Sequence, residues 1–216
     1  MEICSKITGY KNLGSEFILN TNCADIKLYF LTDEIIRVRA SFNKEFAEES
    51  YILSLTAWAD RLDELFKGER TRVEPAKFNF IEDDSALKFS TKKLTLEINK
   101  DSINIKLFDA EGTELYSSLA GNPFTLDSNK RITHYSRMNE DDCFYGFGEK
   151  AGVLNKNKEF LRERATDAMG YDPVKFDTLY KHVPFYIKLD RNNKKALGIF
   201  YHNSGKIIHC MSNSAL

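Results

Sequence analysis

The polar segment at residues 165–173, with the sequence ATDAMGYDP, carries the side chains best suited to chemistry. It places Asp167, Tyr171 and Asp172 around Gly170. Carboxylates accept hydrogen bonds from neighbouring sugar hydroxyls, and aromatic rings pack against the apolar faces of sugar rings. These residue types on a turn-prone loop therefore indicate a sugar-binding site. The structural alternative is an Asx-turn, in which Asp167 or Asp172 bonds to the backbone two residues further on.

A second candidate is the tripeptide Gly146-Phe147-Gly148, which Glu149 follows directly. The tripeptide is too short for a dinucleotide-binding fingerprint, and no predicted helix follows it. Glycines within a strand more often permit close backbone packing or a bulge. Glu149 has two interpretations: a strand-end acid that pairs with a nearby cation, or a residue on the floor of a sugar site.

The histidines and cysteines are dispersed along the chain. No pair has the His-x-His or Cys-x-x-Cys spacing of a metal site, so we expect neither a metal ion nor a cofactor. No Gly-x-Ser-x-Gly motif occurs, and Cys143 lies in an apolar segment where a buried, inert thiol is expected. We predict reduced thiols, with one oxidised pair as the alternative. The residues concerned are His134, His182, His202, His209, Cys4, Cys23, Cys143 and Cys210.

The overall charge excludes several classes of partner. The chain has 216 residues, and its 31 basic and 32 acidic side chains give a net charge of −1. We therefore expect no nucleic-acid or membrane partner. The N-terminal segment lacks the pattern of a secretory signal, and no apolar stretch approaches the ~18 residues needed to cross a bilayer. These features predict a soluble, cytoplasmic protein.

Alternation of apolar and polar residues dominates the chain and predicts β-strands. In the segment 36–42, Ile36, Val38, Ala40 and Phe42 fall on one face. Many such short segments, separated by turn signals every ~8–12 residues, predict an all-β antiparallel sandwich formed as a single domain over residues 1–216. One short connecting helix is expected over residues 60–68. The other clear strand segments are 26–31, 87–89, 94–98, 103–108, 185–189 and 196–201.

Three motifs follow one another along the chain: YGFGE at 145–149, TDAMGYD at 166–172 and LYKHVPF at 179–185. In this order they resemble the N-terminal domain of glycoside hydrolase family 31, which includes α-glucosidases and α-xylosidases. Two earlier segments, Thr56-Ala57-Trp58 and residues 68–73, are similar to upstream parts of the same domain. The resemblance extends over about residues 50–205.

The resemblance implies a galactose-mutarotase-like β-sandwich, or supersandwich, that precedes a catalytic (β/α)₈ barrel. Two barrel aspartates would act as nucleophile and acid/base in a retaining α-glycosidase that hydrolyses terminal α-linked sugars. The family order places both aspartates beyond residue 216, so we expect no catalytic residue in this chain and no activity from it alone. The expected partners are an α-glucoside or oligosaccharide substrate and the protein's own downstream barrel.

Within the family, a loop of this domain reaches over the barrel mouth. The resemblance assigns sugar contact to Asp167, with Tyr171 and Asp172 beside it. Arg164-Ala165 stand where many relatives have Trp-Asn, which leaves the choice between glucosides and xylosides open.

Two other functions fit the same fold. One is a free-standing carbohydrate-binding module. The other is an aldose 1-epimerase, in which Glu149, His134 and His182 would supply the base and acid. An apolar face that docks on the barrel would also let the isolated chain self-associate.

Overall fold

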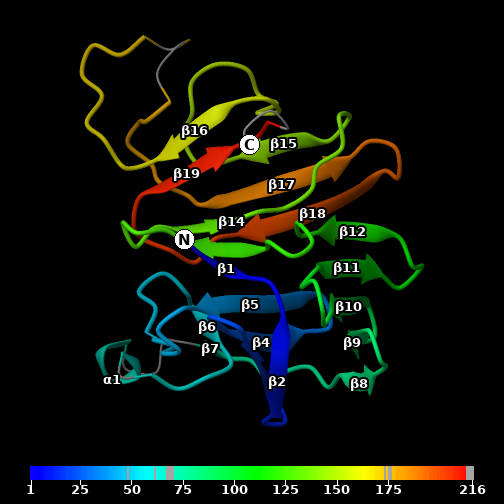
Figure 1. Cartoon of the computed structure of the whole chain (residues 1–216). Helices are drawn as coiled ribbons and strands as arrows, with labels where there is room; N and C mark the ends of the chain where they lie inside the picture. Colours follow the sequence, from blue (N-terminus) through cyan, green and yellow to red (C-terminus); the bar gives the residue numbers. More distant parts are fainter. Residues whose placement is uncertain (48, 61, 67–70, 173, 175–176, 213–216) are drawn as a thin grey trace. The chain divides into compact units, whose positions relative to one another are not determined.

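Strands form nearly all the regular structure of this chain. The computed structural model describes residues 1–47, 49–60, 62–66, 71–172, 174 and 177–212. Its internal contacts divide the chain into two units, Met1–Arg137 (unit 1) and Met138–Leu216 (unit 2). Figure 1 draws unit 1 from blue to green and unit 2 from yellow-green to red. The single domain expected over residues 1–216 stays a prediction.

Unit 1 is built on two antiparallel sheets. The four-stranded sheet has the order β2 (Ile7–Asn12), β3 (Glu16–Thr21), β4 (Asp25–Thr32), β5 (Ile35–Ser41). The five-stranded sheet has the order β12 (Glu114–Ser117), β11 (Ile105–Asp109), β10 (Leu94–Asn99), β9 (Ala86–Ser90), β8 (Asn79–Glu82). The smaller sheets are β1 (Glu2–Cys4), β13 (Phe124–Leu126), β14 (Ile132–His134), and the parallel pair β6 (Leu55–Thr56), β7 (Thr71–Arg72).

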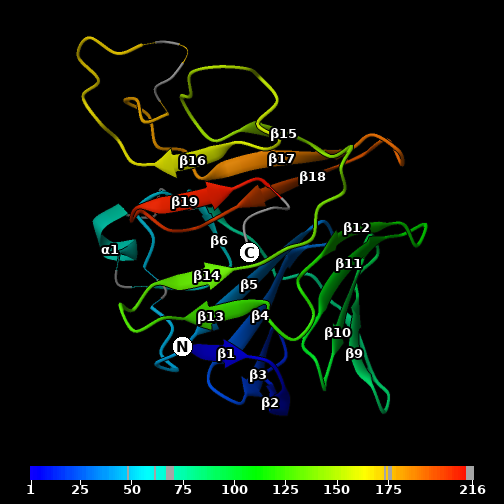
Figure 2. The same cartoon turned by 45° about the horizontal axis from the view of Figure 1, so that its top comes forward.

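The core of unit 1 lies between the two larger sheets, which are adjacent in both views (Figures 1 and 2). Phe17 of β3 and Phe89 of β9 are fully buried, and their ring centroids lie 4.8 Å apart. Burying an aromatic or aliphatic side chain contributes roughly 1.5–3 kcal/mol. The alternating pattern of the sequence therefore produces a sandwich, as expected, and Ile36, Val38, Ala40 and Phe42 pack against its core.

The predicted helix is present but short. Helix α1 covers Asp63–Phe66, and residues 61, 67 and 68 of the expected range lie outside the described residues. The Asp60 carboxylate accepts a hydrogen bond from the Leu62 amide at 2.8 Å, and the Asp63 carboxylate accepts one from the Asp60 amide at 3.1 Å. These bonds satisfy donors that the start of a helix leaves without partners.

Unit 2 has two layers. One is the three-stranded sheet of β15 (Cys143–Gly146), β17 (Phe185–Asp190) and β18 (Lys195–Phe200), and the other is the pair β16 (Phe160–Glu163) and β19 (Ile207–Cys210). Its core joins both layers: Phe144, Leu161 and Tyr186 are buried in one cluster. The hairpin β17–β18 matches the one predicted from the sequence. Strand β11 begins at Ile105, two residues later than expected, and the Ile103 amide donates instead to the Ser5 carbonyl at 2.9 Å.

Candidate functional site

The two glycines of the Gly-Phe-Gly motif bring the backbone of β15 against the segment that precedes β17. A Cβ atom on Gly146 would lie 2.7 Å from the Phe185 carbonyl oxygen, and one on Gly148 would lie 2.7 Å from the Lys181 carbonyl oxygen. Both glycines and Phe147 have positive φ. Phe147 is fully buried and stacks on Tyr186 at 4.7 Å. The close packing expected of these glycines is confirmed, and it places Glu149 beside the loop that joins β16 to β17.

The described parts of that loop, residues 164–172 and 177–184, are drawn from yellow to orange in Figures 1 and 2 and extend away from the strands of unit 2. The Glu149 carboxylate accepts a hydrogen bond from the Tyr180 amide at 3.2 Å. Of the two interpretations of Glu149, the structure supports a place beside the candidate loop, and among the described residues no cation pairs with Glu149. Interaction with the Asp167 carboxylate, together with burial and other nearby negative charge, raises the pKa of the Tyr180 hydroxyl. Asp167 itself is exposed.

The other two predicted site residues behave differently from each other. Tyr171 is exposed and lies within electrostatic reach of the Tyr180 hydroxyl. The Asp172 carboxylate accepts a hydrogen bond from the Val174 amide at 2.8 Å, which is the Asx-turn given above as the structural alternative. The structure thus brings Asp167, Tyr171, Tyr180 and Glu149 together, whereas Asp172 supports its own turn.

The base of the loop is closed by an ion pair and a backbone bond. The Arg162 guanidinium donates through Nη2 to Asp177 at 2.8 Å, and the Thr166 amide donates to the Leu179 carbonyl at 2.9 Å. The first bond joins the end of β16 to the returning arm of the loop (residues 177–184), and the second joins the outgoing arm (residues 164–172) to the returning arm. The loop is therefore fixed at its base, while its exposed carboxylate remains available to a ligand.

A buried cluster of ionisable groups lies behind this base. The Glu163 carboxylate is fully buried, and three nitrogen atoms surround it. Lys150 Nζ and His182 Nε2 lie 3.9 and 3.8 Å from Oε2, and His209 Nε2 lies 3.9 Å from Oε1. These separations exceed hydrogen-bond length, and among the described residues the Glu163 oxygens and both Nε2 atoms have no hydrogen-bond partner.

Burial dominates the titration of this cluster. It raises the pKa of Glu163 to about 7, although the charge of Lys150 and the Val183 amide act in the opposite direction. Burial lowers the pKa of His209 to about 4, with Lys150 and His182 adding to the effect. Burial likewise lowers the pKa values of His182 and Lys150. The two imidazoles therefore favour their neutral forms near neutral pH.

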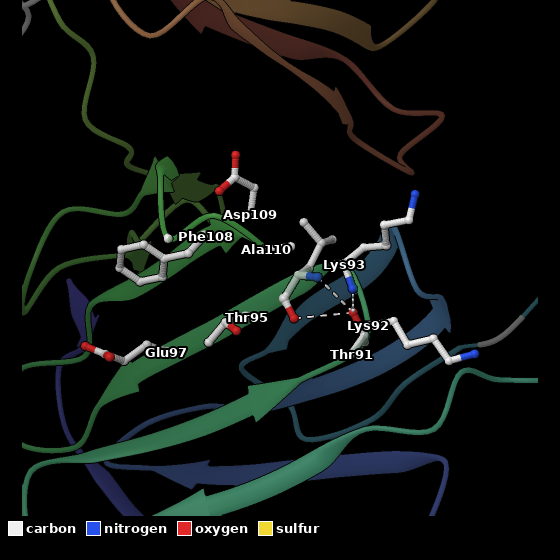
Figure 3. A pocket seen from close by; sticks show the side chains of 10 residues that line it. Thr91, Lys92, Lys93, Thr95, Glu97, Phe108, Asp109 and Ala110 are labelled. Atoms are coloured by element: carbon white, nitrogen blue, oxygen red, sulfur yellow. Dashed lines mark hydrogen bonds between the residues drawn. The ribbon is translucent and has the colours of Figure 1, made fainter.

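Unit 1 has an open hollow of about 450 Å³ lined by β10, the end of β11 and the turns that adjoin them (Figure 3). Its polar groups are already engaged. Thr91 accepts hydrogen bonds from the amides of Lys93 and Leu94, and Lys93 pairs with Glu34 at 2.9 Å. Asp109 accepts the Glu111 and Thr113 amides. This hollow therefore offers few polar atoms to a ligand.

Within the described part of the chain, no group of three or more His, Cys, Asp or Glu side chains is arranged to hold a metal ion. All four cysteines are free, and Cys143 is buried as expected. No helix of the described residues is long and apolar enough to span a bilayer. The cytoplasmic location stays a prediction.

The residues proposed for an epimerase occupy different surroundings. His134 belongs to unit 1, where its Nε2 lies 2.7 Å from the Tyr116 hydroxyl. Glu149 and His182 belong to unit 2, where Glu149 holds the Tyr180 amide and His182 faces Glu163. The structure does not bring these three residues together within either unit.

Sequence reasoning missed Arg162, Glu163, Asp177 and Tyr180 as parts of the site. The only local signal is an excess of charge around 162–164, which is ordinarily read as an exposed face. Tyr180 lies within the LYKHVPF motif, which by itself indicates no role for its hydroxyl.

A sequence profile for the glycosyl hydrolase 31 N-terminal galactose mutarotase-like domain matches residues 25–208. The chain belongs to this family. The GH31 N-terminal domain assigned by the resemblance is thus confirmed, as is the mutarotase-like β-sandwich. A relative of known name, Alpha-glucosidase 2 of Bacillus thermoamyloliquefaciens, is 26% identical over 195 residues, which cover 89% of this chain and 22% of that protein.

Solved structures share the fold of this GH31 domain. A Flavobacterium johnsoniae GH31 dextranase complexed with glucose has a TM-score of 0.73 at 23% identity, covering 95% of this chain and 23% of that one. The GH31 α-xylosidase of Xanthomonas citri has a TM-score of 0.59 at 19% identity, covering 86% of this chain and 18% of that one. The chain thus spans less than a quarter of the length of these relatives.

Proposed function

We propose that this domain forms one wall of the substrate pocket of a retaining, α-glucosidase-like enzyme that hydrolyses terminal α-linked sugars. The catalytic carboxylates would lie on a (β/α)₈ barrel downstream. Family membership and the names of the relatives support this proposal: an α-glucosidase, an α-xylosidase, and a dextranase studied with isomaltotriose and with glucose. The small share of each relative that the chain covers supports a catalytic part elsewhere.

The observation that carries the proposal is the exposed Asp167 carboxylate, which lies close enough to Tyr180 to raise the pKa of its hydroxyl, on a loop with a fixed base. An ionised carboxylate offers about four acceptor positions, so the exposed Asp167 has positions for vicinal sugar hydroxyls. The nearby Tyr171 ring is available to pack on a sugar face.

We propose that an apolar sheet face of unit 2 docks on the catalytic barrel. Strand pairing sets Phe185 opposite Phe200 and Ile187 opposite both Tyr145 and Gly198. Phe185, Ile187 and Phe200 are 40, 40 and 42% exposed, whereas their neighbour Tyr186 points into the core. An exposed apolar patch of this kind is typical of an interface. The occupant we favour is the part of the enzyme that this chain does not cover.

The test of sugar binding uses Asp167→Asn, with Asp84→Asn of unit 1 as the control because Asp84 is an exposed acid distant in sequence from the loop. In the full-length protein, Asp167→Asn should raise KM for an aryl α-glucoside by about 10- to 100-fold, the loss expected for one charge-assisted hydrogen bond. Asp84→Asn should leave KM unchanged. An unchanged KM in Asp167→Asn would refute the role of Asp167.

The isolated chain provides a second test. It should not hydrolyse an aryl α-glucoside, and its affinity for maltose or isomaltose should be about millimolar or weaker, because only one wall of the pocket is present. NMR titration measures that affinity and locates it at residues 164–181. Turnover by the chain would overturn the assignment of catalysis to the barrel. Micromolar binding would instead indicate a free-standing carbohydrate-binding module.

A further inference from the structure

Burial of the ionisable cluster around Glu163 carries a penalty in folding free energy. Leaving a buried polar atom without a hydrogen bond costs about 1–3 kcal/mol, and buried ion pairs are often no more stable than apolar side chains in their place. Here both Glu163 oxygens and two imidazole nitrogens lack such a bond among the described residues. A contribution to stability alone therefore does not explain why this position carries a glutamate.

The position of the cluster indicates a role in holding the loop. Glu163 is the last residue of β16, so the chain enters the loop directly after it. His182 stands on the returning arm, three residues before β17 begins at Phe185. Lys150 follows Glu149 and donates a hydrogen bond to the Arg162 carbonyl at 2.7 Å. The cluster thus touches both arms of the loop and the segment that carries Glu149.

We propose that Glu163 is a positioning residue, which holds the outgoing and returning arms of the loop through Lys150 and His182 and so fixes the place of Asp167. This inference rests on the proposed sugar-binding role of the loop. It concerns a residue that does not touch the sugar: Glu163 is fully buried, whereas Asp167 is exposed.

The charge of Glu163 decides which neighbour it holds. A protonated Glu163 can donate its O–H to the neutral His182 Nε2, 3.8 Å away, after a small approach of the two groups. That bond joins β16 directly to the returning arm. An ionised Glu163 can only accept, so it favours the Lys150 ammonium, 3.9 Å from Oε2. The loop base should therefore be tighter when Glu163 is protonated.

Other charged groups facing the cluster set the balance between these two states. His209 approaches the second Glu163 oxygen from β19. The charge of Asp177 raises the pKa of Lys150, whereas the charges of Arg162 and Lys156 lower it. Because burial raises the pKa of Glu163 to about 7, the change falls near neutral pH.

The test is amide hydrogen exchange of residues 164–172 and 177–181 in the whole chain, corrected for intrinsic exchange, at about pH 5.5 and about pH 8.5. Protection should be at least about threefold higher at the lower pH in the wild type. Glu163→Gln, which cannot ionise, should abolish this difference, whereas the exposed Glu159→Gln should retain it. Equal protection at both pH values in the wild type, or an unchanged difference in Glu163→Gln, would overturn the proposal.

A measurement on the wild type keeps the proposal testable if Glu163→Gln does not fold. The His182 Cε1–H resonance should shift with an inflection near pH 7, the value given by burial of Glu163, in addition to its own titration. A His182 resonance without that inflection would overturn the proposal.

Sugar binding separates this proposal from the function on which it rests. Asp167→Asn should lose the sugar-induced shifts and keep the pH-dependent exchange. Suppose that Glu163→Gln abolishes the pH-dependent exchange of the wild type, and that the wild type binds no sugar. The role of Asp167 then fails, and the coupling of Glu163 to the loop stands. If sugar binds equally to wild type and Glu163→Gln at both pH values, the positioning role fails alone.

Discussion

Arg162 and Asp177 face each other across the base of the loop that carries Asp167. The Arg162 guanidinium donates to Oδ1 of Asp177 at 2.8 Å from Nη2, and the Arg162 amide donates to Oδ2 at 2.9 Å. The Asp177 side chain is largely buried, which alone would raise its pKa, yet the bonds to Arg162 hold its pKa below the usual value. One carboxylate thus ties the end of β16 to the returning arm.

Asp177→Asn should loosen this base, because an amide keeps the shape of the side chain but loses its charge. We expect the free energy of unfolding to fall by about 1–2 kcal/mol, the usual loss for charge-assisted hydrogen bonds that are partly exposed. Amide exchange in residues 164–172 should rise. Asp172→Asn is the matched control, since asparagine can keep the Asx-turn with Val174.

The Arg162–Asp177 pair should also make the stability of the domain depend on pH. A carboxyl group whose folded-state pKa is lowered contributes stability above its unfolded value, and this stability is lost as the pH falls through the folded value. The wild type should therefore lose its advantage over Asp177→Asn as the pH falls below 3.8, the ordinary value for aspartate. An advantage that persists in strong acid would show that charge is not its source.

Gly148→Ala tests the close approach of the motif to the loop. The new Cβ would meet the Lys181 carbonyl oxygen at 2.7 Å and the Val183 amide at 2.9 Å, both backbone atoms. Gly170→Ala is the control, because Gly170 also has positive φ but no atom lies within 4 Å of its Cβ position. We expect about 1 kcal/mol of destabilisation in the control and about 2–4 kcal/mol in Gly148→Ala, measured by urea unfolding. Equal losses would contradict the contact.

The sequence predicted the strands because alternation is a local property. In β17, Tyr186 is buried while Phe185 and Ile187 are exposed, and the period of two that produces this pattern is visible in five consecutive residues. The pairing of β16 with β19 was not predictable in the same way. It sets Leu161 opposite His209, 48 residues apart, and neither strand has a turn that would bring it to the other.

The sequence likewise predicted one part of the site, the loop, and missed another part, Glu163. The composition of the loop indicated sugar binding, and the same local pattern allowed the Asx-turn that Asp172 forms. Glu163 carried no signal, because only long-range packing removes it from water. A charged residue in a polar segment is ordinarily exposed, and the burial that raises the pKa of Glu163 comes from side chains on other segments, including His182 and His209.

Glu163 and His209 should give opposing contributions to stability as the pH changes. The pKa of Glu163 rises from 4.5 to about 7 on folding, so its contribution is full below 4.5 and is lost as the pH rises through 7. The pKa of His209 falls from 6.5 to about 4, so its contribution is full above 6.5 and is lost toward 4. The wild type should therefore vary little between these limits and lose stability from about pH 6.5 to about pH 8.

Glu163→Gln removes one of the two opposing contributions. Its free energy of unfolding should rise relative to the wild type between about pH 5 and about pH 8, by an amount on the order of 2–3 kcal/mol. Urea unfolding at several pH values measures this difference, with Glu159→Gln as the exposed control. If Glu163→Gln follows the wild type at every pH, folding does not raise the pKa of Glu163.

Ile187 and Phe200 provide the test of the proposed docking face. Both are exposed on the outer side of the β15-β17-β18 sheet. Without a catalytic domain to cover it, this face should drive self-association of the isolated chain, because burial of apolar surface favours association by roughly 25 cal/mol per Å². Sedimentation velocity over a range of concentrations should detect dimers or larger species.

Ile187→Thr combined with Phe200→Thr should shift the chain toward the monomer, since threonine keeps β-propensity while removing apolar surface. Ile81→Thr on β8, exposed to a comparable extent in unit 1, should not change the distribution. In the full-length enzyme the double substitution should instead lower stability, because the face would be covered. A monomeric wild-type chain at high concentration would argue against a large apolar docking face, and equal effects of the two sets of substitutions would place the association elsewhere.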